Sequence, residues 1–230
     1  MHNSKSSKKD EECMVSFGRY GGHEYRSPDA TVGEGKCLVE SKWMKVMQHT
    51  VRQDGGEGKD ADLIPDWLWI DYHDRINVLV QDPNSDLGNF LVFRQTKYAL
   101  EGKDSLAIVG GIIEPGEDPK QAAQREVEEE LAGLQCLHFH FLGRFRTDVN
   151  RGMGWVNSFL AMDCHRYQHD SLASNKLQPE QIGDADSERQ DVLSISLSQL
   201  HLSLREGKFL EVQWSNTVSL ALMNLELYTT

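Results

Sequence analysis

The sequence has few cysteines, no long apolar run and a shortage of positive charge. Its four cysteines, at positions 13, 37, 136 and 164, lie far apart without a C-x-x-C pair, so we expect neither a zinc knuckle nor a dense disulfide framework. No stretch approaches the roughly 20 apolar residues of a membrane span, and no apolar segment of the kind found in signal peptides follows the polar residues 1–12. These absences favour a cytoplasmic protein in a reducing compartment with no membrane partner. They do not exclude a location in an organelle.

Positive charge is scarce relative to negative charge. The 230 residues carry 24 Lys and Arg against 36 Asp and Glu, a formal net charge of −12. Proteins that bind nucleic acid in bulk usually have the opposite balance, because they must neutralise phosphates. We therefore do not expect a nucleic-acid partner. The 39% hydrophobic residues are enough for the core of one catalytic-sized domain with additional segments.

Local patterns predict three segments. Residues 1–36 show no sustained period and are predicted to be a flexible tail, residues 37–65 to form N-terminal strands, and residues 66–230 to form the main domain. Short β-branched and aromatic runs between turn signals predict a mixed sheet. The clearest helix is expected between residues 118 and 131, because Asp118 is a good N-cap, Pro119 suits the first helical position, Gln121 completes a capping box and Gly133 marks the end. Two more helices are predicted near residues 199–207 and 215–227.

The helix carries an acidic face. Glu126, Glu129 and Glu130 are spaced i, i+3 and i+4, which places them within an arc of about 100°. Residues 117–130 hold six acids and two bases, and each like-charge i,i+4 pair costs about 0.2–0.5 kcal/mol unless a cation compensates it. Hard oxygen ligands at this density suit Mg²⁺ or Mn²⁺. A solvated acidic helix face is the alternative interpretation.

The string from Gly111 to Glu130 resembles the signature of the Nudix hydrolases, G-x5-E-x7-R-E-U-x-E-E-x-G-U, in which U is a bulky aliphatic residue. Ala132-Gly133-Leu134 stands where the signature expects Gly-U, which concerns the helix end and not the acidic residues. The resemblance implies an α/β fold, an α/β/α sandwich with a mixed sheet and a loop–helix–loop motif. It also implies a Mg²⁺ site, with Mn²⁺ possible, formed by Glu126, Glu129, Glu130 and the carbonyl of Gly110. Catalysis then falls to Glu129 and Glu130, with Gly111, Glu117 and Arg125 in support.

Flanking sequence resembles the ADP-ribose and nucleoside-diphosphate-sugar pyrophosphatase branch, at residues 93–98 and 142–143 and in the tail from residue 191 to 209. This implies Mg²⁺-dependent hydrolysis of ADP-ribose to AMP and ribose 5-phosphate, or of a nucleoside-diphosphate sugar. We call the signature from Gly111 to Leu134 the box. Many ADP-ribose enzymes have a Pro about sixteen residues after the box, and this sequence has none there. ADP-glucose and UDP-glucose therefore remain possible substrates. In that branch a loop carboxylate acts as general base, and Glu188 matches best; a merely solvated loop is the alternative.

The same resemblance suggests residues that contact the nucleotide substrate. In dimeric relatives, aromatic residues of the N-terminal region stack on adenine, and Trp43 and Trp67 occupy similar places; a core role is the alternative for each. Arginine forks suit diphosphate oxygens, and the candidates are Arg94, Arg144, Arg146 and Arg151. We expect a homodimer in which N-terminal strands of one subunit complete the site of the other.

Two other functions compete with a pyrophosphatase. A non-catalytic nucleotide-sensing Nudix module usually loses box carboxylates, and all of them are present here. An RNA-decapping Nudix enzyme would need a basic groove, against which the net charge argues, although the arginines between residues 144 and 151 leave room for a local patch.

Overall fold

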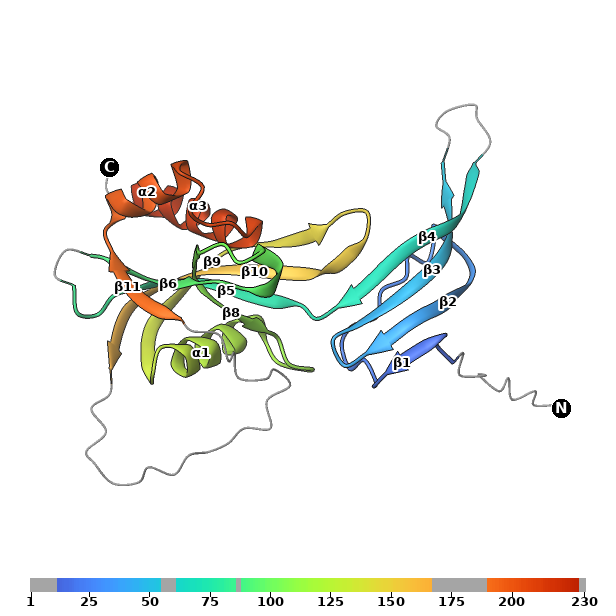
Figure 1. The fold of residues 1–230 in the computed structure, drawn as a ribbon, viewed down its shortest axis with the longest axis horizontal. Helices are drawn as coiled ribbons and strands as arrows, with labels where there is room; N and C mark the ends of the chain where they lie inside the picture. Colours follow the sequence, from blue (N-terminus) through green and yellow to red (C-terminus); the bar gives the residue numbers. More distant parts are fainter. Residues whose placement is uncertain (1–11, 55–60, 86–87, 167–189, 228–230) are drawn as a thin grey trace, which may run out of the picture. The chain divides into compact units, whose positions relative to one another are not determined.

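The structure is a computed structural model that describes residues 12–54, 61–85, 88–166 and 190–227. The chain divides into two compact units (Figure 1). The first comprises Met1–Asp74 and Arg146–Trp155, and the second comprises Arg75–Phe145 and Val156–Thr230. Among the described segments, no helix is both long and apolar enough to cross a membrane.

The first unit is a sheet of N-terminal strands. β2 (Thr31–Ser41), β3 (Met44–Gln53) and β4 (Asp62–Tyr72) pair antiparallel in that order, and β1 (Val15–Phe17) runs parallel to β2. The tight turn between β2 and β3 is held by Ser41, whose Oγ accepts hydrogen bonds from the backbone N–H groups of Trp43 and Met44, each at 3.2 Å. The register of β3 and β4 places His49 opposite Trp67.

The predicted flexible tail is wrong for residues 12–36. This stretch contains β1 and the start of β2, and Tyr20 within it is only 5% exposed. The backbone N–H of Tyr25 donates to Asp71 Oδ1 at 2.9 Å. Sequence periodicity could not reveal this order, because contacts with distant strands hold the segment in place. Residues 1–11 lie outside the described residues.

The second unit is a layered α/β structure. Its sheet contains β5 (Arg75–Gln81), β6 (Phe90–Gln95), β7 (Ser105–Ala107), β8 (Val109–Ile112), β9 (Leu134–Asp148), β10 (Gly152–Arg166) and β11 (Asp191–Ile195). The tip of the hairpin that β9 and β10 form belongs to the first unit. β10 runs parallel to β5, whereas β6 and β8 run antiparallel to it, so the sheet is mixed. A 3₁₀ turn (Tyr98–Leu100) follows β6. In Figure 1, α1 (Pro119–Glu130) covers one face, and α2 (Leu197–Arg205) and α3 (Val212–Leu227) cover the other. The predicted α/β/α sandwich is confirmed.

The helix α1 begins and ends as the sequence predicts. The Asp118 side chain accepts from the Lys120 N–H at 2.9 Å, and the Asp118 N–H donates to Gln121 Oε1 at 3.3 Å. Ala122, Ala123 and Val127 lie on the inner face of the helix and are buried. They anchor the helix to the core. Ala132, which departs from the Nudix signature, has φ +53°, a left-handed conformation that Gly adopts without strain.

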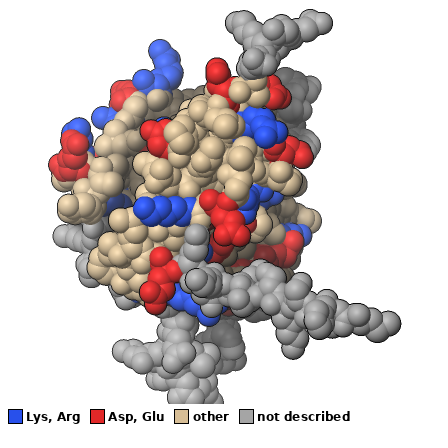
Figure 2. Space-filling view, turned by 90° about the vertical axis from the view of Figure 1, so that its right-hand side faces the viewer, with Lys and Arg blue, Asp and Glu red and all other residues tan. Residues whose placement is uncertain are grey.

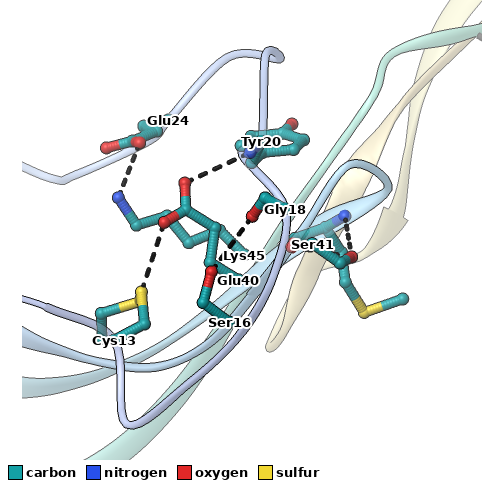
Figure 3. The surroundings of a disulfide bond; sticks show 10 residues. Cys13, Ser16, Gly18, Tyr20, Glu24, Glu40, Ser41 and Lys45 are labelled. Atoms are coloured by element: carbon teal, nitrogen blue, oxygen red, sulfur yellow. Dashed lines mark hydrogen bonds and ion pairs between the residues drawn. A yellow bond between two sulfur atoms is a disulfide. The ribbon is translucent and has the colours of Figure 1, made fainter.

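All four cysteines are paired, in two disulfides that the sequence analysis did not predict. Cys13 bonds to Cys37 in the first unit, and Cys136 of β9 bonds to Cys164 of β10 in the second. Figure 3 shows the surroundings of the first bond, where Glu40 also accepts a hydrogen bond from the Tyr20 N–H at 3.2 Å. Strand pairing brings together cysteines that are 24 and 28 residues apart, a proximity that the spacing alone does not show.

We predict that replacing both Cys136 and Cys164 with Ala lowers the free energy of unfolding by about 3 kcal/mol, because the bond closes a long loop and restricts the unfolded chain. Urea denaturation of the oxidised protein and of the double variant measures this difference. Oxidised protein treated with a reductant should lose at least as much stability. Equal stability of the two proteins, together with four titratable thiols in the native wild type, would contradict the pairing.

Candidate active site

The acidic box lies where β8 meets α1. β8 pairs with β5 so that Gly110 is opposite Asn77 and Gly111 is opposite Ile76. A Cβ atom on Gly111 would lie 1.9 Å from Oε1 of Glu126, which is far inside van der Waals contact. The bare backbone of Gly111 therefore makes room for this carboxylate, and only glycine fits there without moving it.

Arg125 joins the support residue Glu117 to the acidic face. Its Nε and Nη2 donate to the two carboxylate oxygens of Glu117, both at 3.0 Å, in a bidentate pair. Nη1 donates to Glu126 at 2.7 Å and lies 3.4 Å from Oε2 of Glu129. Nη2 also donates to the carbonyl of Ile112 at 3.0 Å, which ties the helix to β8. Sequence analysis assigned Glu117 and Arg125 only a general supporting role, and the structure shows that the role rests on bonds of Arg125 to Glu117 and Glu126.

The electrostatic environment differs between these carboxylates. Burial raises the pKa of Glu126 above its ordinary value, even though Arg125 stabilises the charged form. Burial alone would also raise the pKa of Glu117, but the hydrogen bonds from Arg125 and from the Glu114 N–H outweigh it and lower that pKa. Hydrogen bonds to Glu117 raise the pKa of Arg125. The guanidinium is thus a permanent cation that stabilises the ionised form of its acidic neighbours.

The donor set of the box fits a hard divalent cation. Glu126, Glu129 and Glu130 offer only carboxylate oxygens, and the Gly110 backbone adds a carbonyl without a side chain in the way. Their oxygens do not all lie within 4.8 Å of one another, and Arg125 donates to two of the three carboxylates, those of Glu126 and Glu129. Within the described residues, the only trio that close is Cys13, Cys37 and Glu40, whose two cysteines are disulfide-bonded and so cannot act as thiolate ligands.

A cavity of about 180 Å³ adjoins the box in the second unit. Gly110, Gly111 and Glu130 line one part of it. Further polar side chains line the rest, and sequence analysis named none of them: Arg75, Asn77, Gln95, Lys97, Gln190, Glu211 and Gln213. Burial raises the pKa of Glu211, while the charges of Arg75 and Lys97 oppose that shift. Only the fold brings these residues together, because they come from several separate segments of the chain.

The predicted substrate residues do not gather in one place. Arg94 is exposed and pairs with Asp191 of the neighbouring strand β11 at 2.8 Å, so it lies outside the cavity. The residue at the cavity is Lys97, three positions later. Arg144 is exposed and lines neither this cavity nor the aromatic cavity of the first unit. The proposed base Glu188 lies outside the described residues.

The aromatic cavity of the first unit has a volume of about 410 Å³ and is lined by aromatic and basic side chains. Trp67 and Arg146 are among them, as predicted for substrate contacts, whereas Trp43 is not; the Lys42 ammonium lies 4.5 Å above the Trp43 ring. The Arg146 guanidinium stacks on Tyr25, Trp69 and Trp155 at 4.7–5.6 Å from the ring centroids, and Arg151 lies 5.1 Å from Trp67.

Among the residues lining the aromatic cavity, His49 was not predicted. It is 7% exposed, and its Nε2 has no hydrogen-bond partner within the described part of the chain. Burial, followed by the charge of Arg26, lowers the pKa of His49, so the ring is neutral at pH 7. A neutral imidazole can donate or accept one hydrogen bond to a flat polar ring held between aromatic walls.

Comparison with known proteins decides the family. A family model described as the NUDIX domain matches residues 71–214. The chain belongs to the Nudix family. This confirms the enzyme class predicted from the box, a Nudix hydrolase, and enzymes of this family generally use a divalent metal.

Structural comparison agrees with this assignment. The chain resembles a solved structure described as the crystal structure of an ADP compounds hydrolase, with a TM-score of 0.62 and 18% sequence identity, over 88% of this chain and 97% of that chain. At that identity the likeness shows the fold alone. No curated protein matches the chain by sequence.

Proposed function

We propose that this Nudix hydrolase is a Mg²⁺-dependent pyrophosphatase that hydrolyses a nucleoside diphosphate linked to a sugar. ADP-ribose, which would yield AMP and ribose 5-phosphate, is the leading substrate. The observation that carries the proposal is the complete box, with Glu126 seated against Gly111, Arg125 joining Glu117 to Glu126, and Glu130 lining a cavity. Likeness of fold to an ADP compounds hydrolase supports the choice of an adenine nucleotide.

In this proposal, water attacks one phosphorus of the diphosphate as the P–O bond to the other phosphate breaks. A bound divalent ion supplies charge neutralisation and polarises the attacking water. Glu126, Glu129 and Glu130 would hold that ion with the Gly110 carbonyl, and Arg125 fixes the orientation of Glu126. The Lys97 ammonium in the adjoining cavity offers a positive charge to a phosphate oxygen. Glu188 remains the predicted general base.

The aromatic cavity of the first unit is the proposed site for the base. Trp67 provides a stacking face, and the neutral His49 offers one hydrogen bond to the ring edge. Its volume of about 410 Å³ lies within the range of roughly 300–1,000 Å³ common for small-molecule sites. The homodimer stays a prediction, and light scattering at micromolar protein concentration measures it; a monomer would contradict it.

Two alternatives are less well supported. A sensor module would be expected to have lost part of the metal-binding face, yet every box carboxylate is in place. A decapping enzyme would need a basic groove, and the face shown in Figure 2 mixes Lys and Arg with Asp and Glu side chains. Hydrolysis of capped RNA as fast as ADP-ribose would favour decapping.

A substrate panel tests the proposal. We expect Mg²⁺-dependent release of a nucleoside monophosphate from ADP-ribose, ADP-glucose or UDP-glucose, with kcat/KM at least about 10-fold above that for NADH, diadenosine polyphosphates and capped RNA. Chromatography of the products measures each rate, and EDTA should abolish the activity. Tight nucleotide binding without turnover of any compound would contradict the enzyme assignment and favour the sensor.

A further inference from the structure

The polar cavity of the second unit has a composition that suits a sugar. We propose that Asn77, Gln95 and Glu211 bind hydroxyl groups of the moiety that is linked to the nucleoside diphosphate. This inference rests on the proposed function and deepens it, because it assigns the specificity for that moiety to this cavity.

Two side chains of the cavity have polar atoms without partners. Asn77 is 4% exposed and Gln95 is 5% exposed, so both are more than nine-tenths buried. Across the described residues, Nδ2 of Asn77 and Oε1 of Gln95 have no hydrogen-bond partner, and both side chains line the cavity. A buried amide without a partner is unfavourable. A ligand in the cavity would supply the missing bonds.

The position of Asn77 ties the cavity to the box. Asn77 is paired with Gly110 across β5 and β8. Its Oδ1 would lie 2.8 Å from a Cβ atom on Gly110, so the amide oxygen packs against that glycine. The nitrogen is left to donate to a ligand beside the carbonyl proposed as a metal ligand.

Glu211 adds a charged acceptor to the cavity. It directly precedes α3, and its largely buried carboxyl interacts electrostatically with Arg75 and Lys97, which line the same cavity. The neutral amides and the carboxylate suit groups that both donate and accept hydrogen bonds, while Lys97 suits the phosphate that carries them.

The chemistry and the volume of the polar cavity both suit a small hydroxylated group such as a sugar. Its volume of about 180 Å³ is below the range of roughly 300–1,000 Å³ that accommodates drug-sized ligands, so it suits a sugar better than a whole nucleotide. Each sugar hydroxyl can accept from Asn77 or donate to Gln95 and Glu211. An alkyl group would leave Asn77 Nδ2 and Gln95 Oε1 without a hydrogen-bond partner among the described residues and would give Glu211 no hydroxyl to accept from, which is a strong basis for discrimination.

The variants Glu211→Gln and Asn77→Leu test this assignment in the full-length chain. Hydrolysis is compared between ADP-ribose and the methyl ester of ADP, which keeps the diphosphate but lacks the second sugar. For ADP-ribose, we expect kcat/KM to fall roughly 10- to 100-fold in Glu211→Gln and roughly 3- to 10-fold in Asn77→Leu, in line with the loss of charged and neutral hydrogen bonds. For the methyl ester, which has no second sugar to lose, the fall in each variant should be several-fold smaller than the fall for ADP-ribose.

Glu206→Gln and Asn224→Leu are matched controls, because Glu206 is exposed and Asn224 bonds to its own helix at the Leu220 carbonyl. Calorimetry with ribose 5-phosphate and with inorganic phosphate supplies a readout that needs no turnover. Ribose 5-phosphate should bind wild type more tightly than phosphate does, and Glu211→Gln should remove that preference.

The outcomes separate the two claims. Equal losses for both substrates, or equal binding of ribose 5-phosphate and phosphate by wild type, would overturn the sugar assignment. A different result is that wild type hydrolyses neither substrate but binds ribose 5-phosphate selectively, and that Glu211→Gln removes this binding. That result would support the sugar subsite and contradict the proposed function. Glu211→Gln tests the assignment even if Asn77→Leu does not fold.

Discussion

Replacing Glu129 or Glu130 with Gln is expected to lower kcat for ADP-ribose by about 10²–10⁴-fold. The substitution keeps the shape and length of the side chain but removes a charged oxygen ligand, so the loss reports on charge stabilisation and not on packing. Glu130 lines the polar cavity and Glu129 is 36% exposed on the helix surface, so neither variant should disturb the core. Single-turnover kinetics at saturating Mg²⁺ measures the effect.

Glu128→Gln is the matched control for this prediction. Glu128 is on the same helix, is exposed, and bonds only weakly to Gln135 at 3.4 Å, away from the box. Its substitution removes the same charge, so the general effect of a less acidic helix is included. We expect activity within about 2-fold of wild type. Near-normal rates in both Glu129→Gln and Glu130→Gln would contradict the assignment of the box.

Gly111→Ala is expected to lower kcat/KM by about 100-fold, without unfolding the protein. The new Cβ would lie 1.9 Å from Glu126 Oε1, so the carboxylate must move away from its position beside Gly111. Displacing a group at a reaction centre by about 1 Å can cost 10²-fold in rate. Because the obstructed atoms are at the end of a flexible side chain, the melting temperature should change little.

Gly21→Ala is the control for the glycine substitution. Apart from the adjoining residues, no described part of the chain has an atom within 4 Å of a Cβ at Gly21, and its backbone φ is outside the left-handed region. Activity and melting temperature should match wild type. A Gly111→Ala variant with full activity would show that Glu126 does not need its observed position.

The helix that carries the box could be predicted because its signals are local. Asp118, Pro119 and Gln121 act within one turn, and the spacing of Glu126, Glu129 and Glu130 defines a helix face whatever the rest of the chain does. The match of these residues to the Nudix signature then implied the layered fold.

Residues placed by strand register could not be predicted in this way. Asn77 and Glu211 meet in one cavity although they lie far apart in the sequence, and no short motif marks either residue. Arg94 is predicted to bind diphosphate because a guanidinium suits phosphate oxygens, but strand alternation and the pair with Asp191 place it on the surface. The disulfides were missed for the same reason, since register determines which cysteines face each other.

The central claim is that the glutamates of α1 hold a divalent cation beside Gly110. The most direct test is Mn²⁺ binding by electron paramagnetic resonance, because it needs neither a known substrate nor turnover. Wild type and Glu128→Gln should bind Mn²⁺ with the same affinity, whereas a variant with both Glu129→Gln and Glu130→Gln should lose at least about 10-fold in affinity. Equal affinity in all three proteins would show that the box does not hold the metal.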